Sequence, residues 1–531
     1  MLLYQSMKWK ILNTNRNNII KSLLENRNLK SKKEIKDFIN PKDPANIKIQ
    51  DLGIKKENIN KILKRLQIAK KNKEKIVVFG DYDADGICAT AILWETLYKL
   101  GYDAMPYIPD RFSEGYGIKT SSIVKLNNPK LIITVDNGIV AYDAIKEAKK
   151  RKIDVIVVDH HQKGVEKLTT SYILHSTAVC GSALAWFLAR ELGVDNSLDL
   201  VTIGTIADQM PLLGINRSLV KYGLSKLLKT KRVGLQSLFK DLKLDNIGVY
   251  EVGYLIAPRI NAMGRLANAT DSLRFLCTRD LKKANDLNKL LNETNIERQK
   301  IVDEVLIKAL EKVNEDKIIV ISGKYHEGVI GLASGKITEK FYRPSIVLSE
   351  NKDISKASAR SIFGFNIIEA IKKTGLIIEG GGHPMAAGFS IETKKISDFR
   401  SKINKLSKNK LTDEILEKKL KIDLEINFES INDALLKELK ELEPTGYGNS
   451  SPIFVSKNVE IKEIKPVGSE GKHLKLKLYQ NGIKFDAIYF GGSTNSQKLI
   501  ANCVVNCAYT IEENIWNNKT SIQLKIRDTK I

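Results

Sequence analysis

The chain has 531 residues, 43% of them hydrophobic, so it is too long for one hydrophobic core and we expect about three or four domains. No apolar run approaches the roughly 18 residues of a membrane span. The first residues, MLLYQSMKWKIL, lack the apolar core and cleavage site of a secretory signal. Five scattered cysteines without a CxxC pair argue against a zinc ribbon or a disulfide framework. We therefore expect a soluble cytoplasmic protein.

The charge balance indicates the class of partner. The chain has 86 Lys and Arg against 62 Asp and Glu, which gives a net charge of +24. Codon bias that raises lysine does not by itself explain the shortfall of acids, whereas a positive field of this size suits a polyanion. Nucleic acid is the predicted partner class.

In chain order, residues 1–70 are a Lys- and Asn-rich arm that we predict to form short amphipathic helices, with a Pro-marked break at NPKDPANIK. From 71 to 230, short apolar runs alternate with helical stretches. The predicted strands end in the segments GDYDADG, TVDNG and VVDHH, and the predicted helices are ATAILWETLYKL and AYDAIKEAKKR. This alternation predicts an α/β domain on a parallel sheet, which binds ligands at the carboxyl ends of its strands.

The second half of the chain changes its pattern twice. Residues 231–315 predict a helical connector, because an apolar stripe runs from Leu287 to Leu310 without Gly or Pro. Residues 316–415 return to the strand and helix alternation of a second, smaller α/β domain, and the charged stretch KINKLSKNKLTDEILEKKLK marks its boundary. From 416 to 531 the apolar residues alternate with period two, which predicts an antiparallel OB-like β-barrel.

The acidic motif GDYDADG carries the first prediction of chemistry. It matches half of a calcium loop through Asp81, Asp83, Asp85 and Gly86, but the twelfth position is Ile92 and a strand rather than a helix precedes it, which excludes an EF-hand. We expect a sharp turn at Gly86 and a helix after it. Three close carboxylates would repel one another unless a cation neutralised them, so a metal site is favoured over a solvated acidic loop.

Two more strand ends carry polar residues of the same kind. Asp136 follows one apolar run, and Asp159, His160 and His161 follow another. Neighbouring strands would present these groups along one edge, where carboxylates suit Mg²⁺ or Mn²⁺ and imidazole favours Mn²⁺. Asp208 lies in an otherwise apolar stretch and needs a partner. By itself it could equally be a helix cap, a member of an ion pair or a metal ligand.

These motifs, in this order, resemble a known superfamily. GDYDADG, TVDNG, VVDHH and GTIAD resemble the four motifs of the DHH phosphoesterases, and PRINAMGR, HEGVIGLAS, SARSIFGFNI, GGGHPMAAG and EPTGYGN are similar to later signatures of the RecJ family within it. The resemblance covers about residues 45–531. It implies a DHH catalytic domain on a parallel sheet, a smaller DHH-associated α/β domain and an OB-fold.

The same resemblance implies an activity. The protein would be a single-stranded-DNA-specific 5′→3′ exonuclease that hydrolyses phosphodiester bonds by two-metal catalysis in DNA repair and recombination. Its cofactors would be two divalent ions, Mn²⁺ or Mg²⁺. Single-stranded DNA would be the main partner, with a helicase and a single-strand-binding protein as further candidates.

The resemblance also assigns roles to residues. The implied metal ligands are Asp81, Asp83, Asp85, Asp136, His160 and Asp208. All of these except Asp81 are also implied catalytic residues, together with His161. The implied substrate-binding residues are Arg259, Ser358, Arg360, Ser361, Gly381, Gly382 and His383.

Two other functions remain as alternatives. One is a DHH phosphoesterase of small substrates, such as short RNA, a cyclic dinucleotide or pyrophosphate, for which the C-terminal barrel and the +24 charge would be superfluous. The other is a non-catalytic nucleic-acid-binding scaffold, which we would expect to have lost metal-site acids that this chain retains.

Overall fold

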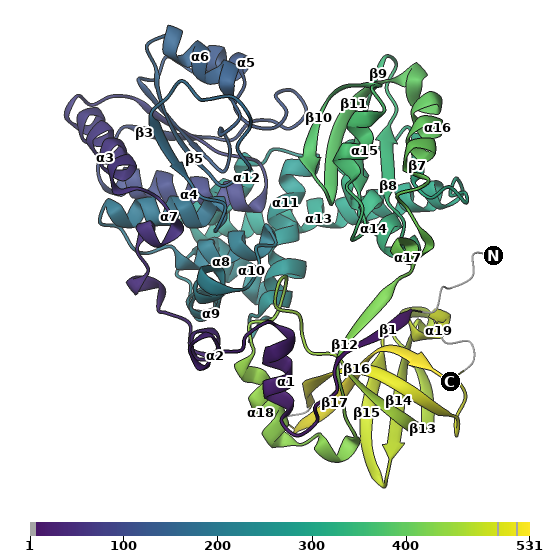
Figure 1. Cartoon of the computed structure of the whole chain (residues 1–531). Helices are drawn as coiled ribbons and strands as arrows, with labels where there is room; N and C mark the ends of the chain where they lie inside the picture. Colours follow the sequence, from purple (N-terminus) through teal and green to yellow (C-terminus); the bar gives the residue numbers. More distant parts are fainter. Residues whose placement is uncertain (1–6, 496–498, 517–518) are drawn as a thin grey trace. The chain divides into compact units, whose positions relative to one another are not determined.

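The computed structural model describes residues 7–495, 499–516 and 519–531, which fall into two compact units (Figure 1). The larger unit is residues 41–410, and the smaller unit joins the residues up to 40 to those from 411 onward. The first six residues of the expected N-terminal arm lie outside the described residues. None of the described helices is long and apolar enough to cross a membrane.

The first sheet of the larger unit is parallel throughout, as predicted. Its order is β3-β2-β4-β5-β6. The strands are β2 (Ile76–Phe79), β3 (Ala104–Tyr107), β4 (Leu131–Val135), β5 (Asp154–Asp159) and β6 (Tyr172–His175). Strand β2 has β3 on one side and β4 on the other, so the order in which strands are added to the sheet reverses between β2 and β4. In such sheets the carboxyl ends of the strands at this point form the usual ligand crevice.

Both faces of this sheet are covered, which explains why its strands are apolar on both sides. Alternate residues such as Phe79 and Ile132 pack against α5 and α6, while Val78 and Ile133 pack in the main core with α4, α7 and α8. The helices around the sheet are α3 (Lys56–Lys71), α4 (Ala84–Lys99), α5 (Thr120–Lys125), α6 (Tyr142–Lys150) and α7 (Gly181–Glu191), preceded by the short turns η1 (Pro44–Asn46) and η2 (Ile49–Leu52).

The expected sharp turn at Gly86 is wrong. Helix α4 already begins at Ala84, so Gly86 lies in its first turn. Glycine is required there for space, because an added Cβ would lie 2.6 Å from Cβ of Asp81. The short distance between the strand end and the helix start keeps the acidic residues of this motif close together.

The middle of the larger unit is helical. It contains α8 (Leu198–Ala207), α9 (Gly214–Leu228), α10 (Val233–Asp241), η3 (Glu251–Ile256), α11 (Ala257–Leu266), α12 (Thr270–Cys277) and α13 (Leu281–Leu310). Helix α13 is the long helix that the apolar stripe predicts, and Leu291, Val302 and Val305 on it are buried. The segment η3 is a π-helix.

The second α/β domain has a mixed sheet in the order β10-β11-β9-β8-β7, in which only the pair β7 and β8 is parallel among the described strands. Its strands are β7 (Ile319–Gly323), β8 (Ser345–Ser349), β9 (Ile354–Arg360), β10 (Ile377–His383) and β11 (Ala386–Glu392). Its helices are α14 (Ile330–Phe341), α15 (Ile367–Lys373), η4 (Thr393–Lys395) and α16 (Ile396–Ser407). Strand β10 lies at the edge of the sheet.

The smaller unit is built on a closed barrel, in which β13 pairs with both β14 and β16. Its C-terminal elements are α17 (Asp413–Leu416), β12 (Lys419–Glu425), η5 (Phe428–Ser430), α18 (Asp433–Glu441), β13 (Phe454–Val467), η6 (Ser469–Gly471), β14 (His473–Gln480), β15 (Ile483–Tyr489), α19 (Gly492–Asn495), β16 (Val504–Trp516) and β17 (Lys519–Lys530). Most pairs are antiparallel, as predicted, and β15 pairs with β17 in parallel.

The N-terminal arm is helical only in part. Helices α1 (Ile19–Asn26) and α2 (Lys32–Ile39) are present, but β1 (Lys8–Asn13) is a strand that pairs in parallel with β12. The charged stretch before the barrel is typical of a helix, but its last three residues, 419–421, begin β12. Both segments are rich in exposed lysines, and their conformation is set by pairing across about 400 residues rather than by a local pattern.

Candidate active site

The first acidic motif links strand β2 to helix α4. Asp81 follows β2, and Asp83 is the N-cap of α4, where its side chain accepts a hydrogen bond of 3.0 Å from the Gly86 N–H. Asp85 lies in the first turn of the helix. Asp81 and Asp85 are each only 2% exposed. These carboxylates therefore lie buried at the carboxyl edge of the sheet, where the strand order reverses.

Asp85 is held by the N-terminus of helix α7. Its carboxylate accepts hydrogen bonds of 2.7 Å from the Gly181 N–H and 3.0 Å from the Ser182 N–H. N–H groups in the first turn of a helix lack intrahelical partners, and the helix dipole favours an anion there. A Cβ added at Gly181 would lie 2.5 Å from a carboxylate oxygen of Asp136, so glycine lets α7 approach both acids.

Two strand ends and a helix end bring Asp136, His160 and Asp208 together. Asp136 follows β4 with a left-handed φ of 61°, His160 follows β5, and Asp208 is the C-cap of α8. Nε2 of His160 lies 3.1 Å from Oδ1 of Asp136 and 3.7 Å from Oδ2 of Asp208. Elements that are distant in the sequence thus converge on one point.

The predicted ligands form overlapping groups whose donor atoms lie within 4.8 Å of one another. These groups are Asp81, Asp83 and Asp136; Asp85, His160 and Asp208; and Asp136, His160 and His161. Among the described residues, Oδ1 of Asp81 is buried without a hydrogen-bond partner. Oδ1 of Asp136 and Nε2 of His160, although 3.1 Å apart, form no hydrogen bond with each other or with another described group. Because buried polar atoms are normally paired, these oxygen and nitrogen donors fit divalent cations.

Burial dominates the electrostatics of this acidic cluster. Burial raises the pKa of Asp136 well above its usual range, and Asp85 and Asp83 raise it further. Burial and then Asp83 shift the pKa of Asp81 in the same direction. Burial, followed by Asp85 and Asp83, raises the pKa of Asp208 to about 8. Without a cation, burial and mutual repulsion therefore make the ionised form of these carboxyl groups unfavourable.

His161 is held differently from His160. Its Nδ1 lies 2.8 Å from Oδ1 of Asp159, and the hydroxyl of Tyr116 lies 3.1 Å from its Nε2. Burial opposes the charged form of His161, but Asp159 outweighs burial and the pKa rises to about 9. Asp159 is itself fixed by a hydrogen bond of 2.8 Å from the Ile139 N–H. The imidazole of His161 is therefore oriented and favours its protonated form beside the cluster.

Arginines that the sequence did not single out lie next to the acids. Burial, then Arg111 and Arg298, lowers the pKa of Arg265 to about 10, while Asp83 acts in the opposite direction. The guanidinium of Arg111 lies over the ring of Tyr82, 4.2 Å from its centroid. Guanidinium groups beside a cation site are suited to hold the oxygens of a phosphate.

Asn261 on helix α11 fixes the start of α4, because the Ala84 N–H donates to its Oδ1 at 2.8 Å. Asn261 and Arg265 both belong to the motif PRINAMGR, in which the resemblance implies Arg259 as the substrate-binding residue. Arg111 and Tyr116 lie in the irregular segment DRFSEGYG, which has no periodicity that could have revealed them.

Arg259, the expected member of PRINAMGR, is engaged elsewhere. Its Nε donates to Oδ1 of Asn292 at 2.5 Å, and its Nη1 donates to the carbonyl oxygen of Leu255 at 2.6 Å. The charged groups that interact electrostatically with the Arg259 guanidinium are Asp241 and Arg298. Of the two arginines in the motif, Arg265 is the one whose pKa responds to Asp83.

The segment SARS lies on β9, opposite the start of α14. Nη1 of Arg360 donates to the carbonyl of Ala359 at 2.9 Å and to Oγ of Ser358 at 3.3 Å. A Cβ added at Gly331 would lie 2.9 Å from Oγ of Ser358, so these side chains face the first turn of a helix, where anions are favoured. Ser361 donates its hydroxyl to the carbonyl of Phe365 at 2.7 Å, which holds the following turn.

The predicted glycine segment forms the outer edge of the second sheet. Gly381, Gly382 and His383 are exposed residues of the edge strand β10, and Gly382 has a φ of 143°. Apart from its chain neighbours, no described residue has a heavy atom within 4 Å of the place where a Cβ of Gly381 would be. The strand therefore offers open backbone to a ligand.

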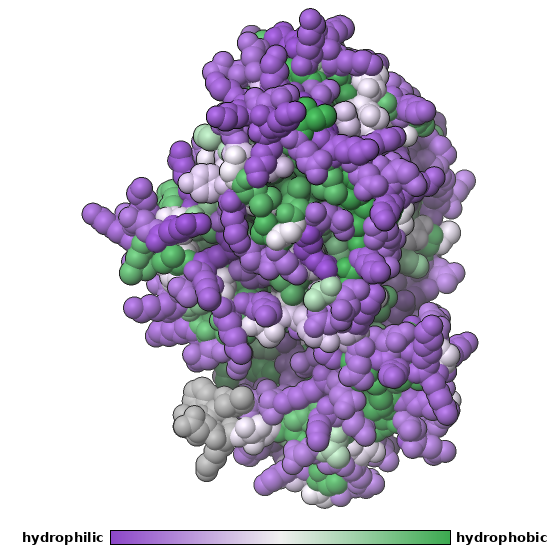
Figure 2. Space-filling model, turned by 90° about the vertical axis from the view of Figure 1, so that its left-hand side faces the viewer, coloured by the Kyte–Doolittle hydropathy of each residue, from purple (hydrophilic) through white to green (hydrophobic). Residues whose placement is uncertain are grey.

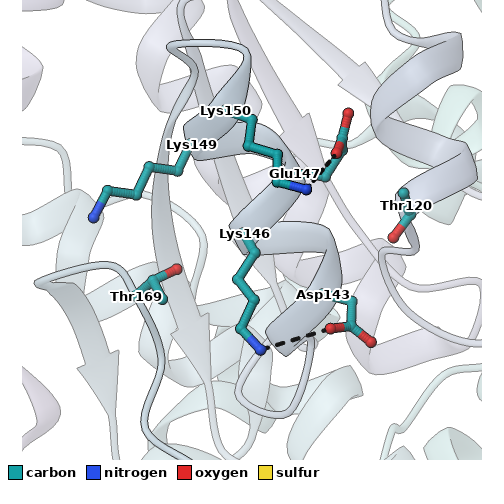
Figure 3. A pocket seen from close by; sticks show the side chains of 7 residues that line it. All are labelled: Thr120, Asp143, Lys146, Glu147, Lys149, Lys150 and Thr169. Atoms are coloured by element: carbon teal, nitrogen blue, oxygen red, sulfur yellow. Dashed lines mark ion pairs between the residues drawn. The ribbon is translucent and has the colours of Figure 1, made fainter.

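A surface hollow elsewhere on the larger unit contains none of these residues (Figure 3). It is lined by Thr120, Asp143, Lys146, Glu147, Lys149, Lys150 and Thr169. Lys146 pairs with Asp143 and Lys150 pairs with Glu147, each at 3.8 Å. These pairs neutralise one another along α6. Figure 2 shows a face of the molecule on which hydrophilic residues predominate, with hydrophobic residues between them. The hollow is a solvated helix surface rather than the site of chemistry.

The architecture and the clustered carboxylates define a metal-dependent phosphoesterase of the DHH type. Residues 75–205 match the DHH family, N-terminal domain, residues 307–409 match the DHHA1 domain, and residues 422–528 match the RecJ OB domain. The parallel-sheet domain, the second α/β domain and the C-terminal barrel are thus as the sequence predicts.

Comparison with individual proteins gives the family. The chain is 33% identical to the single-stranded-DNA-specific exonuclease RecJ of Bacillus subtilis (strain 168), over 97% of this chain and 68% of that protein. The crystal structure of RecJ in complex with Mn²⁺ from Thermus thermophilus has a TM-score of 0.82 and 26% identity, and covers 99% of this chain and 79% of that chain. For the Mg²⁺ complex from the same organism the TM-score is 0.76, with 26% identity over 99% and 78% of the two chains. This chain belongs to the RecJ family.

Proposed function

We propose that this protein is a single-stranded-DNA-specific 5′→3′ exonuclease that acts in DNA repair and recombination. The observation that carries the proposal is the group of buried acids and imidazole with unpaired donor atoms at the carboxyl edge of the parallel sheet. It occurs in a chain whose relatives are named single-stranded-DNA-specific exonucleases. The match of residues 422–528 to the RecJ OB domain favours DNA over a small phosphoester as the substrate.

The geometry supports two divalent ions, Mn²⁺ or Mg²⁺, as the cofactors. Asp81, Asp83 and Asp136 would hold one ion, and Asp85, His160 and Asp208 would hold the other. When bound, such ions lower the pKa of water and neutralise charge on the phosphate and the leaving oxygen. The buried oxygens of Asp81 and Asp136 would then gain the partner that they lack among the described residues.

The other side chains would bind and orient the strand. His161, oriented by Asp159 and Tyr116, would donate a hydrogen bond or a proton to an oxygen of the scissile phosphate. Arg265 and Arg360 would bind flanking phosphates, with Ser358 beside them. The exposed backbone of Gly381 and Gly382, with His383, would contact the sugar-phosphate chain, and Arg259 and Ser361 would support this surface indirectly.

We also propose the domain bounds, the location and the partners of the protein. Residues 71–230 would be the catalytic domain, 231–315 the connector, 316–415 the DHH-associated domain and 416–531 the OB domain. DNA as substrate makes the cytoplasm the proposed location. A helicase and a single-strand-binding protein are proposed partners. An enzyme restricted to single strands needs a helicase to unwind duplex DNA or a binding protein to present the unwound strand.

The deciding experiment uses end-labelled single strands, blunt duplexes, and duplexes with 5′ or 3′ overhangs, each with Mn²⁺ or Mg²⁺. We expect single strands and 5′ overhangs to be degraded from the 5′ end to mononucleotides, while blunt duplexes persist. Shortening from the 3′ end would overturn the polarity. Equal digestion of duplex and single strand would overturn the specificity, and inactivity on DNA with turnover of a cyclic dinucleotide would favour a small substrate.

A further inference from the structure

A pair of exposed tyrosines, Tyr250 directly before the π-helix η3 and Tyr254 within it, is not used by the site described above. The rings of Tyr250 and Tyr254 are stacked, with centroids 4.9 Å apart and an interplanar angle of 25°. They are 61% and 69% exposed, whereas Val252 and Ile256 on the other side of the same turn are fully buried. The pair therefore presents the outer faces of its aromatic rings to the surroundings.

The position of η3 links this pair to the catalytic edge. A Cβ added at Gly253 would meet Cγ2 of Ile206 at 3.8 Å, and Ile206 lies in helix α8, which ends at Asp208. Helix α11 follows η3 without a break and carries Asn261 and Arg265 to the start of α4. The tyrosines are thus on the chain segment that leads directly into the site. π-Helical turns are rare and are frequent at functional sites.

The charges beside the pair favour an anionic partner. The guanidinium of Arg259 donates to the carbonyl oxygen of Leu255, the residue that follows Tyr254 in the chain. Arg298 lies within electrostatic range of both Arg259 and Arg265, so positive groups run from the tyrosines toward the acidic cluster.

Three acids lie near this row of arginines, and all three are already bonded. Asp303, which acts on Arg298, pairs with Lys336 at 3.0 Å. Asp241 accepts a hydrogen bond of 2.8 Å from the amide of Asn292, and the carboxylate of Glu251 accepts one of 2.8 Å from the Gly248 N–H. Asp241 acts on Arg259 across Asn292, which separates them. The acids therefore fix the local structure and leave the aromatic faces open.

We infer that Tyr250 and Tyr254 form a stacking platform for bases of a single-stranded nucleic acid, a few nucleotides from the scissile phosphate. This inference rests on the proposed function, because it makes the platform part of the substrate path. Stacked exposed rings can add a base on an outer face without any sequence preference, and the adjacent arginines can bind the phosphates of the same nucleotides. The platform would hold the strand behind the nucleotide that is being removed.

The first test compares Tyr250→Ala with Tyr254→Ala, and the double variant, on two substrates. These are an oligothymidylate of about 20 nucleotides and one of about three nucleotides, which is too short to reach the platform. For the long strand we expect KM to rise about 10- to 100-fold in the double variant, with kcat within about two-fold. The short strand should be unaffected, and Tyr→Phe at both positions should restore the wild-type KM. Tyr98→Ala, at a 64% exposed tyrosine on α4, is the matched control.

A second test needs only the wild-type protein. A single abasic position is moved along the long strand, and KM is expected to rise at one or two positions beyond the cleaved nucleotide. The double alanine variant should lose this dependence. An unchanged KM in the variant, equal losses on both lengths, or no such position in the wild type would overturn the platform. If the wild type degrades no single strand at all, the proposed function fails, and anisotropy of the labelled abasic strands then tests the platform by binding alone.

Discussion

In the larger unit, the sheet of β2 to β6 ends in carboxylates, whereas the sheet of β7 to β11 carries Arg360 and exposed glycines. Asp81, Asp85 and Asp136 of the first sheet are each 2% exposed, and one oxygen each of Asp81 and Asp136 is unpaired among the described residues. The glycines of the second sheet are exposed on an edge strand, and burial lowers the pKa of Arg360. The two sheets thus present different groups, buried carboxylates at the first and a guanidinium with open backbone at the second.

The difference indicates a division of roles. Buried like charges are unfavourable unless a cation joins them, so the first sheet is organised around ions that neutralise its acids. Open backbone and a guanidinium at a helix start suit the oxygens of a phosphate. In our proposal one sheet holds the metals and the other holds the strand, and each prediction below tests one side of that division.

The largest effect is expected from Asp83→Asn combined with Asp136→Asn. Because both carboxylates belong to one proposed ion site, nuclease activity should fall by at least about 10³-fold. The same change removes repulsion between buried acids, so the metal-free protein should melt at a higher temperature than the wild type. Asp143→Asn on the surface of α6 is the control. Retained activity would refute the metal-site assignment, and a lower melting temperature in EDTA would refute the electrostatic argument.

The pH dependence of the metal-free protein tests the acids in a different way. Asp208 has a folded-state pKa of about 8, against about 4 in an unfolded chain. Between these values the folded state binds more protons, so the free energy of unfolding should fall as the pH rises from about 4 to about 8.

Mn²⁺ replaces those protons, so the gain in Tm on adding it should be larger at about pH 8 than at about pH 6. Thermal unfolding in EDTA and in Mn²⁺ measures both slopes, and Asp208→Asn should flatten the metal-free one. A metal-free protein that becomes more stable with rising pH in this range would contradict the raised pKa values.

On the other sheet, Arg360→Gln should raise KM about 10- to 100-fold and change kcat much less, because a phosphate contact is lost and the metal site is intact. The dependence of KM on salt should also become shallower, since fewer counterions are released on binding. Lys352→Gln, at an exposed lysine of the same domain, provides the control for a lost surface charge. A large fall in kcat with unchanged KM would place Arg360 on the catalytic side of the division.

Substitutions at two neighbouring glycines distinguish a structural role from a contact with DNA. At Gly382 a Cβ would lie 2.3 Å from the carbonyl oxygen of Ala386 and φ is 143°, so Gly382→Ala should destabilise the second domain by about 1–3 kcal/mol. At Gly381 the space is open, so Gly381→Ala should keep the Tm and raise KM several-fold only if DNA approaches the backbone there. Melting curves and kinetics on single strands distinguish the two, and an unchanged KM in Gly381→Ala would remove β10 from the DNA path.

The sequence predicted the acidic residues at the ends of the first sheet better than the basic and aromatic residues around them. Asp81, Asp136 and His160 follow buried apolar strands, and parallel strands bring their ends to one edge, so local pattern and topology suffice. Arg111 and Tyr116 lie in an irregular loop whose path depends on tertiary packing. No local pattern could predict strand β1, because its partner lies about 400 residues away. The motif PRINAMGR also cannot tell its two arginines apart, since only the folded structure shows that Asp83 acts on Arg265 while Arg259 bonds to Asn292 and Leu255.

The smallest effect concerns Tyr116, which the sequence did not indicate. Its hydroxyl lies 3.1 Å from Nε2 of His161 and 3.5 Å from the carbonyl oxygen of Asp136, so it connects the oriented imidazole to the acidic edge. Tyr116→Phe removes this hydrogen bond and keeps the ring, so kcat should fall about 2- to 10-fold, as expected for about 0.5–1.5 kcal/mol. Tm and the affinity for Mn²⁺ should not change, because Asp159 still holds Nδ1 of His161 at 2.8 Å. A loss as large as that of the double aspartate variant would mean that Tyr116 positions the metal ligands rather than His161 alone.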